Sequence, residues 1–125
     1  MFDSNVFLEG TCKNNDEGYE LKTNITYYRG IPLSMVNDIL VETDGEPVDR
    51  ASIRCSVDDG EYWFTLDEME TVVGHKWEYG YPMTVKVLGD KLSKGAHEVK
   101  LTVIVRTAYV PHPIEGFKTR TVVID

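Results

Sequence analysis

Hydrophobic and polar residues alternate with a period of two over much of this chain. In residues 19–27 one side of the alternation is mainly apolar and the other is polar; the first side carries Tyr19, Leu21, Thr23, Ile25 and Tyr27. This pattern is typical of an antiparallel strand with one face buried and the other in water. We therefore predict a strand over these residues.

The longest alternation runs from His97 to Val110. Its apolar side carries Val99, Leu101, Val103 and Val105. At ~3.4 Å per residue this run would span roughly 50 Å, well beyond the usual length of a strand. We expect a bend or a β-bulge to divide it.

Shorter strands are predicted at residues 5–8, 38–43, 53–57, 61–64, 83–88 and 118–124. Turn-forming residues separate them: Asp44-Gly45, Asp58-Asp59-Gly60, Gly89-Asp90 and Lys94-Gly95. Short strands joined by tight turns favour an all-β fold. We predict one domain over residues 1–125, an antiparallel β-sandwich.

One short helical turn is expected to interrupt the strands. Thr65 and Glu68 have the spacing of a capping box, in which each residue bonds to the backbone of the other. Leu66, Met69 and Val73 follow on one helical face, and Gly74 can end the helix. A helix this short must pack on the sheets to be stable.

The charged residues of the chain argue against some classes of binding partner. The chain has 13 basic and 21 acidic residues and a formal net charge of −8. This charge argues against a nucleic-acid or anionic-membrane partner, which would need a basic stripe. The N-terminus is acidic and no apolar run is long enough to span a bilayer, so we predict a cytoplasmic protein. Cys12 and Cys55 are too few for a disulfide framework and are expected to be reduced.

The residues give no complete catalytic set. The acidic clusters at residues 58–61 and 67–70 are explained by turn chemistry and by a helix N-terminus. His75, His97 and His112 lack metal-ligand spacing, and we expect His97 to be a residue at the entry to a strand. No serine lies in a nucleophile elbow, and no glycine-rich phosphate loop is present. We therefore predict no catalytic or metal-binding residue in this chain.

Aromatic residues and prolines gather instead in three segments, residues 27–34, 76–82 and 109–117, which we call the three loop segments. Tyr, Trp and Arg dominate the energetics of protein interfaces. Some of these residues could equally belong to the core: Tyr27 continues the apolar face of its strand, and Trp77 could cap the sandwich. His112 lies between two prolines that stiffen the backbone, which suits either binding or an ordinary loop corner.

Five motifs, in order along the chain, carry a resemblance to a known family. They are Tyr27-Tyr28-Arg29-Gly30-Ile31-Pro32-Leu33-Ser34, Val41-x-x-Asp44-Gly45-x-x-Val48, Lys76-Trp77-Glu78-Tyr79-Gly80, Gly95-x-His97-x-Val99 and Tyr109-Val110-Pro111-His112-Pro113-Ile114-Glu115-Gly116. The ordered set resembles the small (β) subunit of bacterial C-glycoside deglycosidases, from about Tyr19 to Ile124.

The resemblance implies an accessory subunit of a heteromeric lyase. Such enzymes cleave the carbon–carbon bond between a sugar and an aromatic aglycone, for example in flavonoid C-glucosides, after the sugar has been oxidised to its 3-keto form. The family's large (α) subunit resembles a TIM barrel and holds a divalent metal, which we expect to be manganese, together with the acid and base residues. The small subunit is a β-sandwich without a cofactor of its own, and the heterodimers can assemble further.

On this basis we predict that the loop segments contact the α subunit or rim its substrate pocket. The predicted residues are Tyr28, Arg29, Pro32, Trp77, Tyr79, Tyr109, Pro111 and His112. Arg29 would form a two-pronged ion pair with a partner carboxylate, and His112 is the candidate to reach the sugar as a positioning group. Two alternatives stay open: a stand-alone carbohydrate-binding module with Trp77, Tyr79 and Tyr81 as a stacking platform, and a small metal-dependent enzyme.

Overall fold

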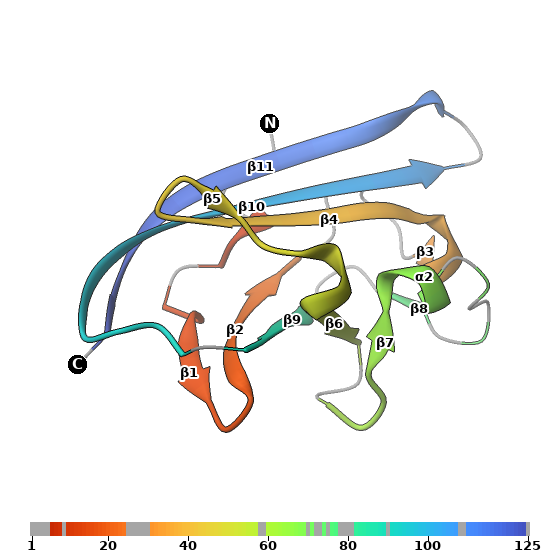
Figure 1. The fold of residues 1–125 in the computed structure, drawn as a ribbon. Helices are drawn as coiled ribbons and strands as arrows, with labels where there is room; N and C mark the ends of the chain where they lie inside the picture. Colours follow the sequence, from red (N-terminus) through yellow and green to blue (C-terminus); the bar gives the residue numbers. More distant parts are fainter. Residues whose placement is uncertain are drawn as a thin grey trace.

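The computed structural model describes residues 6–8, 10–24, 31–57, 60–69, 71, 74, 76–77, 82–89, 91–107 and 110–124. Within these residues all strands but β3 and β8 form two antiparallel sheets that pack face to face, with the long β10–β11 hairpin extending along the top of Figure 1. The predicted all-β antiparallel sandwich is confirmed.

The larger sheet has the strand order β1 (Lys13–Asn15), β2 (Gly18–Thr23), β9 (Met83–Leu88), β6 (Ile53–Ser56) and β7 (Phe64–Thr65). The facing sheet has the order β11 (Val110–Ile124), β10 (Gly95–Thr107), β4 (Val36–Thr43) and β5 (Glu46–Pro47). A two-stranded ladder joins β3 (Ile31–Pro32) to β8 (Lys76–Trp77). Short helices lie at η1 (Leu33–Met35), η2 (Arg50–Ser52) and α2 (Leu66–Met69).

The alternating apolar residues meet between the two sheets. Leu21, Val85 and Cys55 lie side by side across β2, β9 and β6 and are all 0% exposed. Leu101 and Val41 are paired on the facing sheet and are at most 1% exposed. Burial of such side chains contributes about 1.5–3 kcal/mol each. The alternation of apolar and polar residues therefore places one face of each sheet in the core.

Most predicted strands are present. Residues 38–43, 53–57 and 83–88 correspond to β4, β6 and β9, and residues 118–124 are the second half of β11. The pairing of β10 with both neighbours shifts register next to Val105, which confirms the predicted irregularity in the long strand. The strand predicted over residues 19–27 is confirmed as far as Thr23, and residues 25–27 lie outside the described residues.

Two strand predictions are wrong. Val6, Phe7 and Leu8 are not in a strand, although Val6 and Phe7 are buried, because a short apolar run can fill a core in any backbone conformation. The strand predicted over residues 61–64 begins only at Phe64; Glu61 and Tyr62 form an exposed bend. The very short strands β1, β3, β5 and β8 were not predicted, since two or three residues show no periodicity.

Turn chemistry and helix capping agree with the sequence. Asp44 and Gly45 have φ angles of 52° and 83° and join the paired residues Thr43 and Glu46, as a two-residue hairpin turn with two positive φ angles requires. At α2, the Thr65 backbone N–H donates to Glu68 Oε1 (2.8 Å) and the Glu68 N–H donates to Thr65 Oγ1 (3.1 Å). This is the predicted capping box. The helix ends at Met69, before Gly74.

The strand pairing defines two ends of the sandwich. At one end Val105 of β10 pairs with Val36, and Thr107 pairs with Val110; we call this the hairpin end. At the other end lie the Asp44-Gly45 turn and the pair Gly95 and Ile124; we call this the clamp end, for the contacts of Asp44 described below. In Figure 1 the hairpin end is on the right, with β3, β8 and α2, and the clamp end is on the left.

Candidate functional site

The β3–β8 ladder brings two of the three loop segments together. Ile31 is paired with Trp77 and Pro32 with Lys76, although the two segments lie far apart in the sequence. Pro32 is partly buried and leads directly into η1 and β4. The first and second loop segments are therefore held against each other by backbone hydrogen bonds.

The third loop segment reaches the same end of the molecule. Residues 110–116 were predicted as a loop, but they form the start of β11, so Pro111 and His112 lie in a strand. Proline is compatible with a strand at the edge of a sheet, where its missing N–H breaks no ladder, and β11 is an edge strand of its sheet among the described residues. Because Ile114 pairs with Val105 and Val105 with Val36, this strand begins at the same end of the sheet as β4, with β10 between them.

The predicted interface residues divide into three groups. Pro32, Pro111 and His112 lie at the hairpin end. Trp77 also lies there, but its side chain is 0% exposed, which favours the alternative that it is a core residue. Tyr28, Arg29, Tyr79 and Tyr109 lie outside the described residues, so their interface roles stay predictions. Tyr81 of the proposed sugar-stacking platform also lies outside them.

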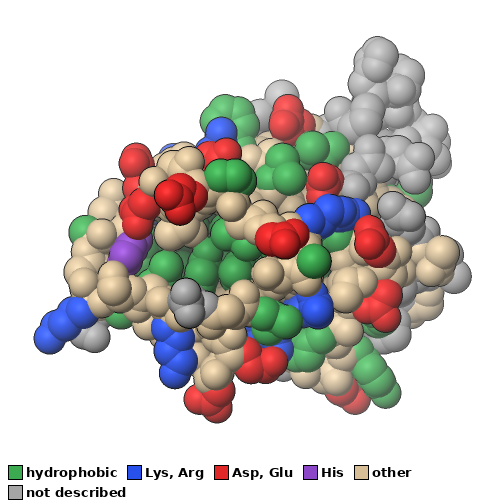
Figure 2. All heavy atoms as spheres, viewed as in Figure 1, with side chains coloured by type: hydrophobic (Ala, Val, Ile, Leu, Met, Phe, Trp, Pro, Cys, Tyr) green, Lys and Arg blue, Asp and Glu red, His purple; other side chains and the backbone are tan. Residues whose placement is uncertain are grey.

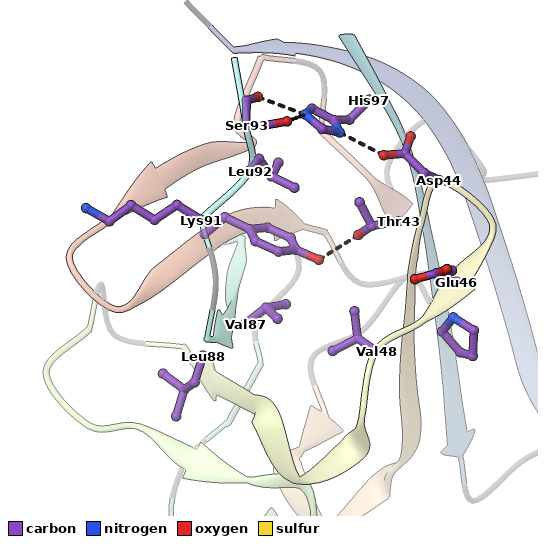
Figure 3. Close-up of a pocket in the computed structure, with 12 residues that line it drawn as sticks. Thr43, Asp44, Glu46, Val48, Val87, Leu88, Lys91, Leu92, Ser93 and His97 are labelled. Carbon is purple, nitrogen blue, oxygen red and sulfur yellow. Dashed lines mark hydrogen bonds and ion pairs between the residues drawn. The ribbon is translucent and has the colours of Figure 1, made fainter. Parts of the chain in front are cut away.

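A hollow opens between the two sheets at the clamp end. It has a volume of about 580 Å³, and its lining includes Tyr19, Val48, Val87 and Leu92. Figure 2 shows hydrophobic side chains on its floor and acidic side chains along its upper rim. In Figure 3 the side chains of Ser93, His97 and Asp44 point toward one another at its rim, whereas Lys91 extends away from them.

His97 and Asp44 form the clamp that closes this rim. His97 Nδ1 lies 2.8 Å from Asp44 Oδ2, and His97 Nε2 donates to the Ser93 carbonyl oxygen at 2.8 Å (Figure 3). The second oxygen of Asp44 accepts from the Glu98 backbone N–H at 2.9 Å. Ser93 Oγ also lies 3.2 Å from His97 Nε2. Because a carbonyl and a carboxylate both accept, this geometry favours the imidazolium form, in which both ring nitrogens donate.

The clamp shifts both pKa values in the direction that keeps the pair charged. The hydrogen bond to Asp44, then the Ser93 carbonyl, raises the pKa of His97 above its usual 6.5. The hydrogen bond from His97, then the Glu98 N–H, lowers the pKa of Asp44 below 3.8. Hence the clamp stabilises the fold most between about pH 4 and 6.5.

We expect the replacement His97→Gln to remove part of the pH dependence of stability. In the wild type, the contribution of His97 is fully present below pH 6.5 and is lost as pH rises through its raised folded pKa. Thermal unfolding from pH 5 to pH 9 should therefore show a smaller fall in Tm on the alkaline side for the variant than for the wild type. Parallel curves would contradict the clamp. Lys91→Gln, on the same hollow, is the control.

Two further polar groups of the hollow bond to each other. The hydroxyl groups of Tyr19 and Thr43 lie 2.6 Å apart in a hydrogen bond. In the part of the chain that the structure describes, no three His, Cys, Asp or Glu residues come close enough to hold a metal ion. His97 is the third residue of β10, which agrees with its predicted place at the strand entry.

The sequence alone does not indicate that Asp44 and His97 form a pair. The Asp-Gly turn and the histidine after Lys94-Gly95 can each be recognised in the sequence, but only the pairing of Val99 with Thr43 shows that they adjoin.

Cys12 and Cys55 are both free, as predicted. Burial, with Glu20 as a second cause, raises the pKa of the Cys12 thiol to about 11, and burial raises that of Cys55 to about 12. Of the helices that the structure describes, none has the length and apolar character needed to cross a membrane.

Comparison with known proteins places this architecture in a family. The model of the family described as C-glycoside deglycosidase beta subunit matches residues 1–109. This chain belongs to the C-glycoside deglycosidase beta subunit family. The match confirms the family resemblance and covers the sandwich through β10, whereas β11 and most of the fifth motif lie beyond the matched residues.

Similar proteins carry the same description. The chain is 31% identical to the 3'-dehydrocarminate deglycosidase beta subunit of Microbacterium sp., over 89% of this chain and 83% of that protein. It is 27% identical to a C-glycoside deglycosidase beta subunit of Eubacterium cellulosolvens, over 78% of this chain and 66% of that protein. It is 25% identical to another from Microbacterium trichothecenolyticum, over 100% of this chain and 91% of that protein. A beta subunit implies a partner subunit, so the chain is part of a heteromeric complex.

Proposed function

We propose that this C-glycoside deglycosidase beta subunit is the non-catalytic part of a cytoplasmic lyase that removes the sugar from 3-keto C-glycosides. Its role is to stabilise a TIM-barrel-like α subunit and to shape the substrate pocket of that subunit. The family match and the relative named for 3'-dehydrocarminate support the substrate class. Flavonoid C-glucosides are a second group of substrates within the same class.

The proposed elimination reaction needs a base and charge stabilisation, which we assign to a separate catalytic chain. A ketone at C3 acidifies the hydrogen at C2, and loss of that proton gives an enolate from which the aglycone can leave. The step needs a positioned base and stabilisation of the developing negative charge. The polar groups described at the clamp end do not fit this task, because His97 and Asp44 use their hydrogen-bonding atoms on each other and on the backbone. We assign the base and the divalent metal to the α subunit.

The observation that carries the proposal is the convergence of the three loop segments at the hairpin end. Backbone pairing of Ile31 with Trp77 and of Val36 with Val105 joins segments from distant parts of the chain. The sequences of these segments contain tyrosine and arginine, which are suited to bury area and to make directed hydrogen bonds with a partner. A sandwich whose β3–β8 ladder and β10–β11 pairing bring these segments to one end is suited to bind the rim of a barrel.

We expect Arg29→Ala and Tyr109→Ala each to weaken association with the α subunit by about 1–3 kcal/mol, the usual range for an interface hot spot. The measurement is titration calorimetry of each variant with the purified α subunit. Lys91→Ala, an exposed cationic residue at the clamp end, is the matched control and should bind like the wild type. Unchanged binding of both loop variants would contradict the proposed interface.

Activity and glycoside binding of the isolated chain distinguish the proposed function from the two alternatives. We expect the isolated chain to be inactive on a 3-keto C-glycoside and to form an active enzyme only with the α subunit. Activity of the isolated chain that a chelator removes would favour a small metal-dependent enzyme. Glycoside binding by the isolated chain would favour a carbohydrate-binding module, but the burial of Trp77 removes one of the three rings of its stacking platform.

A further inference from the structure

A row with two exposed apolar side chains, on either side of the buried Thr102, crosses the outer face of the four-stranded sheet. Thr102 in the central strand β10 is paired with Leu40 of β4 on one side and with Phe117 of β11 on the other, so the three side chains share one face. The inner neighbour Leu101 is fully buried, whereas Leu40 is 44% and Phe117 is 55% exposed. Next to this row, toward the hairpin end, lies the partly buried Ile104. We call Leu40, Thr102, Ile104 and Phe117 the outer-face patch.

Acidic side chains surround this patch. Ile104 is paired with Asp38 and Glu115, so each lies beside it on the same face. On the other side of the patch Lys100 is paired with Glu42, and Lys100 Nζ lies 4.9 Å from the centre of the Phe117 ring. Glu98 follows on the same face of β10. The strand register thus places four carboxylates and one lysine around the outer-face patch, and one of the four, Asp38, is already paired with Arg50 at 3.4 Å.

We propose that the outer-face patch is a second docking surface for the α subunit, and this inference rests on the function proposed above. The patch is continuous with the hairpin end, because β11 runs without a break from Val110 through Glu115 to Phe117. A partner that binds at the hairpin end would therefore also lie close to the outer-face patch. Leu40 and Phe117 are exposed on either side of Thr102, and exposed aromatic and aliphatic side chains that gather on one face are typical of an interface.

Charge identifies the occupant as a different chain. A second copy of this protein would bring a face with the same excess of carboxylates, even with Asp38 paired to Arg50, and the whole chain has a net charge of −8. Like charges that face each other across an interface disfavour association. The surface that fits is an apolar centre edged by lysine and arginine residues, which we assign to the α subunit.

The test uses acidic replacements inside and outside the patch. Phe117→Glu and Leu40→Glu should each raise the Kd for the α subunit at least tenfold, because a carboxylate would be buried in the contact. Val123→Glu is the matched control: Val123 lies on β11 on the same face, is 66% exposed and is paired with Ala96 at the clamp end. It should change Kd less than twofold. All three positions are exposed, so circular dichroism should show unchanged folding.

A second pair of variants tests the charge argument. Glu115→Lys and Glu42→Lys should slow association with the α subunit at low ionic strength, and the difference from the wild type should shrink in high salt. Faster association would overturn the assignment of a basic partner surface.

The outcomes distinguish this inference from the proposed function. A wild-type chain that binds the α subunit, together with Phe117→Glu and Leu40→Glu variants that bind equally well, would overturn the second docking surface and leave the proposed function standing. Failure of the wild type to bind any α subunit would overturn both. Sedimentation that shows a wild-type homodimer abolished by Phe117→Glu would overturn the assignment of the occupant.

Discussion

Replacement of Trp77 by alanine is expected to lower the free energy of unfolding by about 3–5 kcal/mol. The side chain is fully buried, and its strand β8 is the element that pairs with β3 at the hairpin end. Loss of the indole would leave a cavity beneath the convergent loop segments. Urea unfolding followed by circular dichroism measures the change, and the same variant should bind the α subunit more weakly.

Two further variants make this prediction specific. Phe117→Ala removes a ring of which 55% is exposed, and should cost less than about 1 kcal/mol. Trp77→Phe keeps most of the ring and removes the indole Nε1, which is buried and has no hydrogen-bond partner among the described residues. Since an unpaired buried donor is costly, this variant should lose much less stability than Trp77→Ala. Equal losses for both Trp77 variants would contradict the cavity explanation.

Replacement of Gly18 by alanine is expected to lower the free energy of unfolding by about 3 kcal/mol, at the upper end of the usual cost of overpacking. A Cβ atom at this position would lie 2.0 Å from the Val87 carbonyl oxygen, which belongs to the backbone of the adjacent strand β9 and cannot rotate away. The β2–β9 pairing must shift to relieve the clash. Chemical denaturation of the wild type and the variant provides the comparison.

Gly74→Ala is the matched control for Gly18→Ala. A Cβ atom on Gly74 would have no heavy atom within 4 Å, and the backbone there does not have the positive φ that strains other residues. Its stability should change by less than about 0.5 kcal/mol. If Gly18→Ala were equally mild, the close approach of β2 and β9 would be looser than the structure indicates.

The sandwich itself could be predicted because its signals are local. Alternation along β4, β9 and β10 and the Asp44-Gly45 turn each depend on residues close in sequence. The capping box of Thr65 and Glu68 is likewise contained in four residues. These features need no knowledge of distant pairing, and all of them are present in the structure.

The candidate site could be predicted only in part, because its arrangement depends on distant pairing. The sequence indicates which segments carry aromatic residues, but nothing in it shows that Ile31 pairs with Trp77 or that Trp77 is buried. Pro111 and His112 suggested a loop, and only the edge position of β11 explains how two prolines fit into a strand. The sequence likewise does not show that Leu40, Thr102 and Phe117 lie in one row, because the row depends on the register of three strands.

The state of the two native thiols has a practical consequence for spectroscopy. At neutral pH a thiol with a pKa of about 11 or 12 is almost entirely protonated and reacts slowly with electrophiles. An exposed cysteine introduced at position 123 would keep an ordinary pKa near 8.5 and react first. A maleimide dye could then be attached at one chosen point of an otherwise unaltered chain, and subunit assembly could be followed by energy transfer.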